Sequence, residues 1–501
     1  MNADIVIRNG TLIDGTGAPA RPADVVIADG RVARIVERAE ADRPPEPVHG
    51  AREIDAAGLV VAPGFIDVHT HDDVAFLTNP GMDFKVMQGV TTCIAGNCGA
   101  GAAPANERFR EAFERGWAAV LGGSVDDWRW ETCGEFYDAV AQAGISVNAA
   151  FLVPHGVLRF VAMGAERRTP TAEELADMRR RLDEAMRAGA LGLSTGLIYA
   201  PGRYAATEEL IALARVVAEY DGVYASHIRN EADGVLDAME EAFRIGREAG
   251  VPVQISHHKA ALRHNFGRTR ESLALLDQRR AEGIDAHIDM YPYTGSSGPL
   301  AAYLFEGLTP EMAQDWMIAS VETHHEYEGR RLSDIAVEMG VTPYEAGRRL
   351  VEMERGGVVA ILFIMDENDL RRVFAHETCM GGSDGIPSRT GKPHPRLYGT
   401  FPRLLARYVR EERLVPIEAA VRKLSALPAR KFRLKDRGEL REGCWADVTV
   451  FDSDTIADTA TYEDPRRYPR GIEYVIVNGR VVVDRGRHTG VPAGQVLRRG
   501  V

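Results

Sequence analysis

Hydrophobic and polar residues alternate near both ends of the chain, and Gly-containing pairs interrupt the alternation. At the N-terminus, short runs lie at 5–7, 11–13 and 25–27. They are followed by the pairs Asn9-Gly10, Asp14-Gly15 and Asp29-Gly30, respectively. Near the C-terminus, runs at 447–451 and 475–483 follow the same pattern, and the second contains Asn478-Gly479. These patterns are typical of strands joined by tight turns. Because a few short strands cannot bury a face alone, we expect residues 1–62 and 415–501 to form one small β-sandwich domain.

Between these ends, short apolar runs alternate with long amphipathic segments. Thr171 and Glu174 form a capping box, and apolar residues at 175, 178, 182 and 186 follow it with helical spacing. The strand-like runs lie at 65–68, 90–95, 147–153, 191–194, 223–226, 253–256, 286–291 and 379–384. Eight strands with helices between them predict a (β/α)8 TIM-like barrel over residues 63–414. The charged segment at about 307–355 predicts a helical insertion, and a further run at 358–364 has no place among the eight.

Composition narrows the class of protein. The 501 residues contain 60 Lys and Arg against 73 Asp and Glu, a net charge of −13. Nucleic acids and anionic membranes require clustered cations, so neither is an expected partner. No apolar run approaches the length of a membrane span. The five cysteines have no paired spacing and the N-terminus has no secretory pattern, so we expect a cytoplasmic protein. The sequence does not set the oligomeric state.

Polar side chains follow several of the predicted strands, at the end of the barrel where active sites lie. His69 and His71 are two residues apart on a strand and therefore point to one face, where two imidazoles can share a metal. Four later runs end in Cys98, His227, His257 and Asp384. Thiolate, imidazole and carboxylate are all zinc ligands, and a catalytic zinc site leaves one position for water. The sequence therefore predicts a catalytic metal site.

Several motifs carry a resemblance to a known family. The residues Gly64-Phe65-Ile66-Asp67-Val68-His69-Thr70-His71, together with His227, His257 and Ser383-Asp384, resemble the amidohydrolase superfamily. Gly96-Asn97-Cys98-Gly99, Ser256-His257-His258-Lys259, Gly382-Ser383-Asp384-Gly385 and His394-Pro395-Arg396 are similar to the D-aminoacylase branch, the N-acyl-D-amino-acid deacylases. The resemblance spans essentially the whole chain, including the divided β-domain and the insertion.

The resemblance implies two metal positions. A tightly bound zinc ion belongs on Cys98, His227 and His257, and a second, weaker position belongs on His69, His71 and Asp384. Many relatives outside this branch bridge two metals with a carbamylated lysine from the fourth strand, but that strand here reads Leu191-Gly192-Leu193-Ser194-Thr195 and contains no lysine. Cys98 is the expected substitute, with its thiol deprotonated by the metal.

The expected chemistry is hydrolysis of the amide bond of an N-acyl-D-amino acid. Asp384 is the expected catalytic base, which takes the water proton and returns it to the departing nitrogen. A free carboxylate on the substrate needs cationic partners, and Lys259 and Arg396 lie close in sequence to the predicted ligands. Both match family positions that bind the α-carboxylate, as do Tyr199, Tyr291 and Ser297. The family also supplies the D configuration, which the residues alone do not reveal.

The substrate side chain remains open to more than one interpretation. A substrate with an acidic side chain requires another cationic residue near the loop after the seventh strand. Residues 291–305 contain neither Lys nor Arg. Neutral, apolar side chains are therefore expected. The alternatives are a zinc amidohydrolase for N-acyl-D-glutamate or N-acyl-D-aspartate, D-dipeptides, a cyclic amide or an acylated sugar, and, in a different class, a non-catalytic barrel. The presence of all six candidate ligands argues against the non-catalytic barrel.

Overall fold

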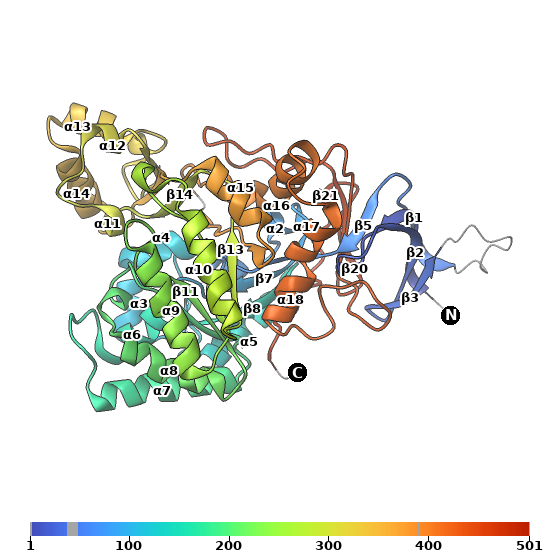
Figure 1. Ribbon diagram of the computed structural model, residues 1–501, viewed down its shortest axis with the longest axis horizontal. Helices are drawn as coiled ribbons and strands as arrows, with labels where there is room; N and C mark the ends of the chain where they lie inside the picture. The colour runs from blue at the N-terminus through green and yellow to red at the C-terminus, as the bar shows by residue number, and fades with distance from the viewer. Residues whose placement is uncertain (1–2, 38–48, 389, 500–501) are drawn as a thin grey trace.

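The computed structural model describes residues 3–37, 49–388 and 390–499 of the chain. A barrel of strands and helices forms its centre (Figure 1). A β-sheet built from both ends of the chain lies on one side of the barrel, and a smaller lobe with helices α11 to α14 lies on the other. None of the helices in the described ranges combines the length and the apolar character that crossing a bilayer requires.

The terminal sheet has nine strands. Their bounds are β1 (Ala3–Leu12), β2 (Arg21–Ala28), β3 (Arg31–Glu37), β4 (Gly50–Asp55), β5 (Val60–Pro63), β18 (Val448–Phe451), β19 (Ile472–Val477), β20 (Arg480–Asp484) and β21 (Arg487–His488). Strand β5 joins the two ends of the chain, because it pairs with β1 on one edge and antiparallel to β18 on the other, with Val61 opposite Val450. The predicted union of the two chain ends in one β-domain is confirmed.

Eight parallel strands form the barrel, as predicted. They are β6 (Phe65–Asp67), β7 (Val90–Ala95), β8 (Asn148–Phe151), β10 (Gly192–Gly196), β11 (Val223–His227), β12 (Val253–Ile255), β13 (Ala286–Met290) and β17 (Cys379–Gly381), with the short β9 (Val153–Pro154) continuing β8. Hydrogen bonds from Leu191 N to Phe151 O (2.8 Å) and from Val68 N to Gly381 O (3.4 Å) close the ring. Each predicted strand-like run overlaps one of these strands.

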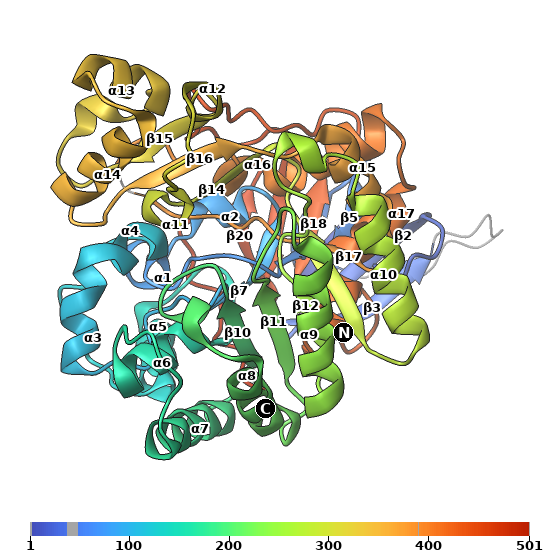
Figure 2. The same cartoon turned by 60° about the vertical axis from the view of Figure 1, so that its left-hand side comes forward.

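Helices surround the barrel, and Figure 2 shows α8, α9 and α10 outside β10 to β12. The helices are α1 (Ala75–Thr78), α2 (Asp83–Val86), α3 (Glu107–Ala112), α4 (Ala118–Leu121), α5 (Cys133–Ala143), α6 (His155–Met163), α7 (Ala172–Arg187), α8 (Thr207–Ala218), α9 (Val235–Ala249), α10 (Thr269–Ala281), α15 (Glu367–Ala375), α16 (Arg396–Arg403), α17 (Ile417–Leu424) and α18 (Ala426–Lys431). The capping box predicted at Thr171 and Glu174 begins α7.

The insertion after the seventh barrel strand contains a sheet that the sequence analysis did not predict. It holds β14 (Gly295–Pro299), β15 (Trp316–Ser320) and β16 (Val359–Phe363) in an antiparallel sheet, with α11 (Leu300–Tyr303), α12 (Pro310–Ala313), α13 (Leu332–Met339) and α14 (Pro343–Met353). The predicted interval of about 307–355 is therefore not purely helical, and its sheet reaches beyond both limits. The unplaced run at 358–364 is β16, the central strand of this sheet. Leu300, Ile335 and Leu350 belong to a separate hydrophobic core in this lobe.

The barrel and the terminal sheet meet closely where β5 passes into β6. A Cβ atom on Gly64 would lie 2.1 Å from Thr91 Oγ1, so only glycine fits at this crossing. Helix α17 begins after residue 414, where the sequence analysis placed a domain boundary, yet it packs against barrel strands β17 and β6. The last helix of the barrel thus lies within the segment assigned to the small domain.

Candidate metal centre

Cys98 lies where two groups of potential metal ligands meet. The first group is Cys98, His227 and His257, and the second is His69, His71, Cys98 and Asp384; within each group the ligand atoms lie within 4.8 Å of one another. The Sγ atom of Cys98 is 3.4 Å from His257 Nε2 and 3.7 Å from His227 Nδ1. It is 3.2 Å from His69 Nε2. A single sulfur atom is therefore placed to contact metal ions in both groups.

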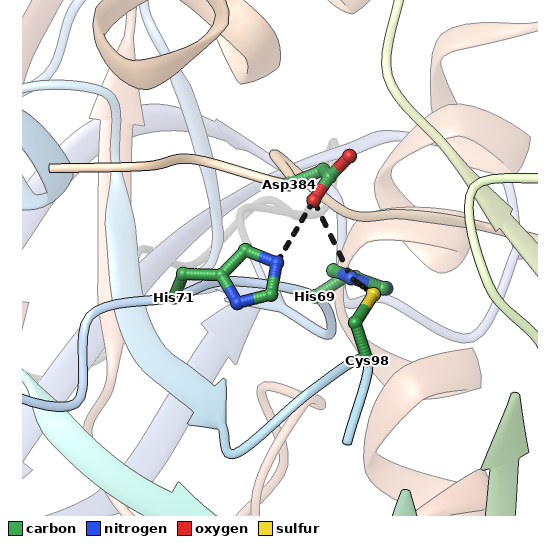
Figure 3. Close-up of side chains that lie close together, drawn as sticks. All are labelled: His69, His71, Cys98 and Asp384. Atoms are coloured by element: carbon green, nitrogen blue, oxygen red, sulfur yellow. Dashed lines mark hydrogen bonds and ion pairs between the residues drawn. The ribbon is translucent and has the colours of Figure 1, made fainter. Parts of the chain in front are cut away.

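The second group brings together side chains that follow the first, second and last barrel strands (Figure 3). Asp384 Oδ1 lies 3.2 Å from His71 Nε2 and 3.5 Å from His69 Nε2. The two histidines follow β6, and Asp384 follows β17. The backbone N–H of Asp384 donates to His69 O at 2.7 Å. This hydrogen bond fixes the two strand ends together, so the carboxylate faces the imidazoles.

Three of the predicted ligands adopt an unusual backbone conformation. Cys98, His257 and Asp384 have φ angles of 52°, 35° and 49°, in the left-handed region that disfavours residues with a Cβ atom. Such residues cost on the order of 1–3 kcal/mol each and cluster at functional sites. Each follows a barrel strand, where the left-handed turn ends the strand and directs the side chain across the mouth of the barrel.

The electrostatics favour ionised ligands. Burial raises the pKa of the Cys98 thiol, but the charges of His69 and His257 and hydrogen bonds from His227 and His257 outweigh it and hold that pKa well below its usual value. Burial also raises the pKa of Asp384, but Arg396 and the imidazoles hold it well below the ordinary range. Both groups are therefore negatively charged at neutral pH, as metal ligation requires.

The donor set fits zinc. A thiolate with imidazole nitrogens is a combination that zinc accepts, and three protein ligands leave a position for water. Strand β10, which reads Gly-Leu-Ser-Thr-Gly, holds no lysine that could bridge two metals. The central place of Cys98 between the two groups is the position that such a bridge would occupy.

Arg396 lies directly beside the second group. Its Nη1 atom is 2.9 Å from Asp384 Oδ2, and its guanidinium carbon is 4.4 Å from the centre of the Tyr291 ring. Arg396 Nη2 donates to the carbonyl of Ser297 at 3.2 Å. Arg396 Nε and Tyr291 Oη are buried without a hydrogen-bond partner among the described residues. Buried polar atoms usually have partners, so these two donors are available to a bound acceptor such as a carboxylate.

Two further predicted substrate residues, Lys259 and Tyr199, lie close to the first group. Lys259 Nζ is buried and contacts Glu231 Oε1 at 2.5 Å, and Glu231 and other neighbours raise its pKa despite the opposing effect of burial. The ring of Tyr199 packs edge-on against His227, with centroids 5.0 Å apart. Its hydroxyl is 3.2 Å from that of Tyr303, a residue of the insertion.

A cavity of about 320 Å³ opens onto the metal-binding groups. Its wall includes His71, Cys98, Asp384, Tyr199 and Ser297. The rest of the wall is mostly small or apolar and comprises Gly99, Ala100, Trp117, Val120, Gly156, Gly196, Ile198, Ala200, Gly202, Arg203, Gly298, Pro299, Ala301, Ala302, Gly356 and Ile386. Arg203 is the one Arg or Lys in the described wall.

Comparisons with known proteins identify the family. The sequence profile of the Amidohydrolase family matches residues 52–328 and 317–483, which together cover most of the chain. This chain belongs to the amidohydrolase family. A D-aminoacylase of Alcaligenes xylosoxydans xylosoxydans is 42% identical over 500 residues, 99% of this chain and 98% of its own length.

Two solved structures match this amidohydrolase over its full length. The N-acyl-D-glutamate deacylase of Bordetella bronchiseptica, in complex with zinc and a phosphonate that mimics the tetrahedral intermediate, has a TM-score of 0.88 and 43% identity over 99% of this chain and 100% of its own. A D-aminoacylase studied for its binuclear metal centre, with one-metal activation and second-metal attenuation, has a TM-score of 0.90 and 40% identity over 99% and 100%. The resemblance found in the sequence is confirmed.

Three buried charged residues of this amidohydrolase support the ligands, although the sequence analysis did not select them. Asp289 Oδ1 accepts from His257 N at 2.7 Å and lies 3.4 Å from His69 Nδ1. Its position inside the apolar run 286–291 was a usable indication, because a buried strand seldom carries an unpaired carboxylate. Glu231 contacts both histidines of the first group. It lies on the loop after β11, and only the folded chain shows what it contacts.

Lys85 is the third of these charged residues, and it contacts side chains at the ends of the first and last barrel strands. Its Nζ atom is 2.6 Å from Asp67 Oδ2, 2.8 Å from Thr70 Oγ1 and 2.9 Å from Ser383 Oγ. It is also 3.2 Å from Asp72 Oδ2. These partners lie beside His69, His71 and Asp384 in the sequence, so one fully buried ammonium group connects the first and last strands of the barrel.

Proposed function

We propose that the chain is a zinc-dependent deacylase that hydrolyses the amide bond of N-acyl-D-amino acids to a carboxylate and a free D-amino acid. Zinc is held by Cys98, His227 and His257, and the weaker second position is formed by His69, His71 and Asp384. The donor set and the full-length similarity to a deacylase solved in complex with zinc support this assignment. When bound, zinc supplies Lewis acidity that polarises the amide carbonyl and lowers the pKa of a water molecule.

The observation that carries the proposal is the 2.9 Å contact between Asp384 and Arg396. In an N-acyl amino acid the α-carboxylate is attached to the carbon next to the amide nitrogen, so any group that binds it must lie a few ångströms from the reacting carbonyl. Arg396 meets that condition, and its guanidinium group, whose Nε has no partner, lies over the ring of Tyr291, whose hydroxyl also has no partner among the described residues. A cyclic amide or an acylated sugar gives these buried donors no carboxylate to bind.

Asp384 performs the proton transfers. It takes a proton from the attacking water as the new C–O bond forms and returns that proton to the nitrogen as the C–N bond breaks, so that the amine leaves neutral. The Arg396 guanidinium keeps Asp384 ionised until that transfer. The left-handed backbone at Asp384 and the hydrogen bond to His69 O hold the carboxylate in place throughout.

The cavity wall supports a neutral or apolar substrate side chain. Trp117, Val120, Ile198 and Ile386 supply apolar surface close to the metal-binding groups. One observation favours the alternative, an acidic side chain: Arg203 is exposed and lies in the same wall. The relatives are divided in the same way, since both D-aminoacylase and N-acyl-D-glutamate deacylase match the whole chain.

Hydrolysis of three substrates tests the proposal. We expect kcat/KM to be highest for N-acetyl-D-methionine, lower for N-acetyl-D-glutamate and lowest for N-acetyl-L-methionine, with all activity lost on removal of zinc by a chelator. A preference for the L-substrate, or activity that survives the chelator, contradicts the proposal.

Arg203→Gln distinguishes the two side-chain classes. If the enzyme prefers neutral substrate side chains, the kcat/KM for N-acetyl-D-glutamate divided by that for N-acetyl-D-methionine should change less than about twofold, because no substrate charge pairs with Arg203. With an acidic specificity, that ratio should fall about tenfold or more, the loss of about 1.4 kcal/mol of charge pairing.

A further inference from the structure

One largely buried carboxylate, that of Glu231, contacts both histidines of the first metal group and Lys259. Glu231 Oε1 lies 2.9 Å from His257 Nδ1 and 2.5 Å from Lys259 Nζ, and its Oε2 lies 3.4 Å from His227 Nε2. The other nitrogens of the two rings, His257 Nε2 and His227 Nδ1, face Cys98. Each imidazole is therefore placed between the sulfur and the carboxylate.

This arrangement sets the tautomer of both rings. A histidine that binds metal through one nitrogen carries its proton on the other, and an acceptor at that nitrogen fixes the ring orientation and makes the ligating nitrogen more basic. Glu231 Oε1 faces His257 Nδ1 at 2.9 Å, and Oε2 faces His227 Nε2 at 3.4 Å, a nitrogen that has no hydrogen-bond partner among the described residues. The same carboxyl group lies against the Lys259 ammonium group at 2.5 Å, which is the partner expected for a carboxylate.

The position of Lys259 also depends on Glu231. Lys259 Nζ is only 2.8 Å from His257 Nδ1. When His257 binds metal through Nε2, its Nδ1 carries the ring proton, so both nitrogens are then donors and need a shared acceptor; Glu231 Oε1 contacts both. The backbone holds the acceptor in place, because Ala261 N donates to Glu231 O at 2.7 Å and so joins the loops after β11 and β12. The side chain itself is largely buried.

We propose that Glu231 is a positioning residue that holds His227 and His257 in their metal-binding tautomers and keeps Lys259 beside them, so that zinc affinity and carboxylate recognition depend on one side chain. The proposal about Lys259 rests on the proposed function. The proposal about the two histidines rests on the metal site alone.

The test is the zinc affinity of Glu231→Gln, measured by competition of the metal-free protein with a chromogenic chelator. The glutamine amide has one acceptor oxygen and one donor nitrogen, so it can accept from one imidazole N–H and not from both. We expect the zinc affinity to fall about 10- to 100-fold. We also expect KM for N-acetyl-D-methionine to rise, because Lys259 loses its anionic partner.

Glu209→Gln is the matched control. Glu209 is another buried carboxylate that contacts a histidine, His155, at 2.8 Å, and neither residue belongs to a metal-binding group. The control should keep wild-type zinc affinity. If Glu231→Gln does not fold, Glu231→Asp provides the same test, since it keeps the charge beside Lys259 but is too short to reach both rings. Zinc affinity within about twofold of wild type in the folded variant, or an equal loss in Glu209→Gln, overturns the proposal. Because this affinity is measured without substrate, its outcome is separate from that of the deacylase assay.

Discussion

Replacing Asp384 with Asn should lower kcat for N-acetyl-D-methionine by about 10²- to 10⁴-fold, the usual contribution of a general base. The amide cannot accept the proton of the attacking water, and no other carboxylate belongs to the two metal-binding groups of the described chain. The tight zinc position should survive, because its three ligands do not include Asp384. Steady-state kinetics together with the zinc content of the same sample measure both effects.

The same variant has an informative control. Asp289→Asn changes a buried carboxylate that contacts His69 and the backbone of His257 and belongs to neither metal group. It should reduce kcat much less than Asp384→Asn. Unchanged turnover in a folded, zinc-loaded Asp384→Asn protein removes Asp384 from the mechanism.

Replacing Cys98 with Ala should remove both the bound zinc and the activity. Cys98 is the one residue common to the two groups of ligands, so its loss leaves the tight position with two imidazoles and the second position without its bridging sulfur. The thiolate is also the anionic ligand of the first group, and the nearby imidazoles already stabilise its charge. Metal analysis after gel filtration, combined with hydrolysis of N-acetyl-D-methionine, measures the result.

Cys379→Ala is the control for the loss of a buried sulfur. Cys379 lies on barrel strand β17, and burial raises the pKa of its thiol to about 12, so it remains a neutral packing group. Its replacement should reduce stability by on the order of 1 kcal/mol and leave the zinc content unchanged. Retention of zinc and activity by Cys98→Ala contradicts the assignment of the metal site.

The barrel could be predicted because its strands follow local rules. Most of the strands are short and largely apolar, so the polar residues that follow them are easy to recognise. His69 and His71 were recognisable from their spacing, and Cys98, His227, His257 and Asp384 from their place at strand ends. The structure brings these residues together because parallel strands of a barrel end at the same rim.

The remainder depends on contacts that no local pattern records. In the insertion sheet, β14 pairs with β16, which lies more than fifty residues further along the chain. The charged helical pattern between them gave no sign of this pairing. Glu231 lies on a loop and acquires its role only when the loops after β11 and β12 meet. The left-handed backbone at Cys98, His257 and Asp384 likewise depends on the surrounding hydrogen bonds, since none of these residue types prefers that conformation as glycine does.

The coordination of zinc in the purified holoenzyme tests the central claim most directly. X-ray absorption at the zinc edge should show one sulfur ligand at about 2.3 Å and imidazole nitrogens at about 2.0–2.1 Å. Cys98→Ala should give no zinc signal because it loses the metal, and the sulfur contribution should persist in Cys379→Ala. A zinc ion coordinated by nitrogen and oxygen alone in the wild-type protein, or a fully active protein without zinc, contradicts the account.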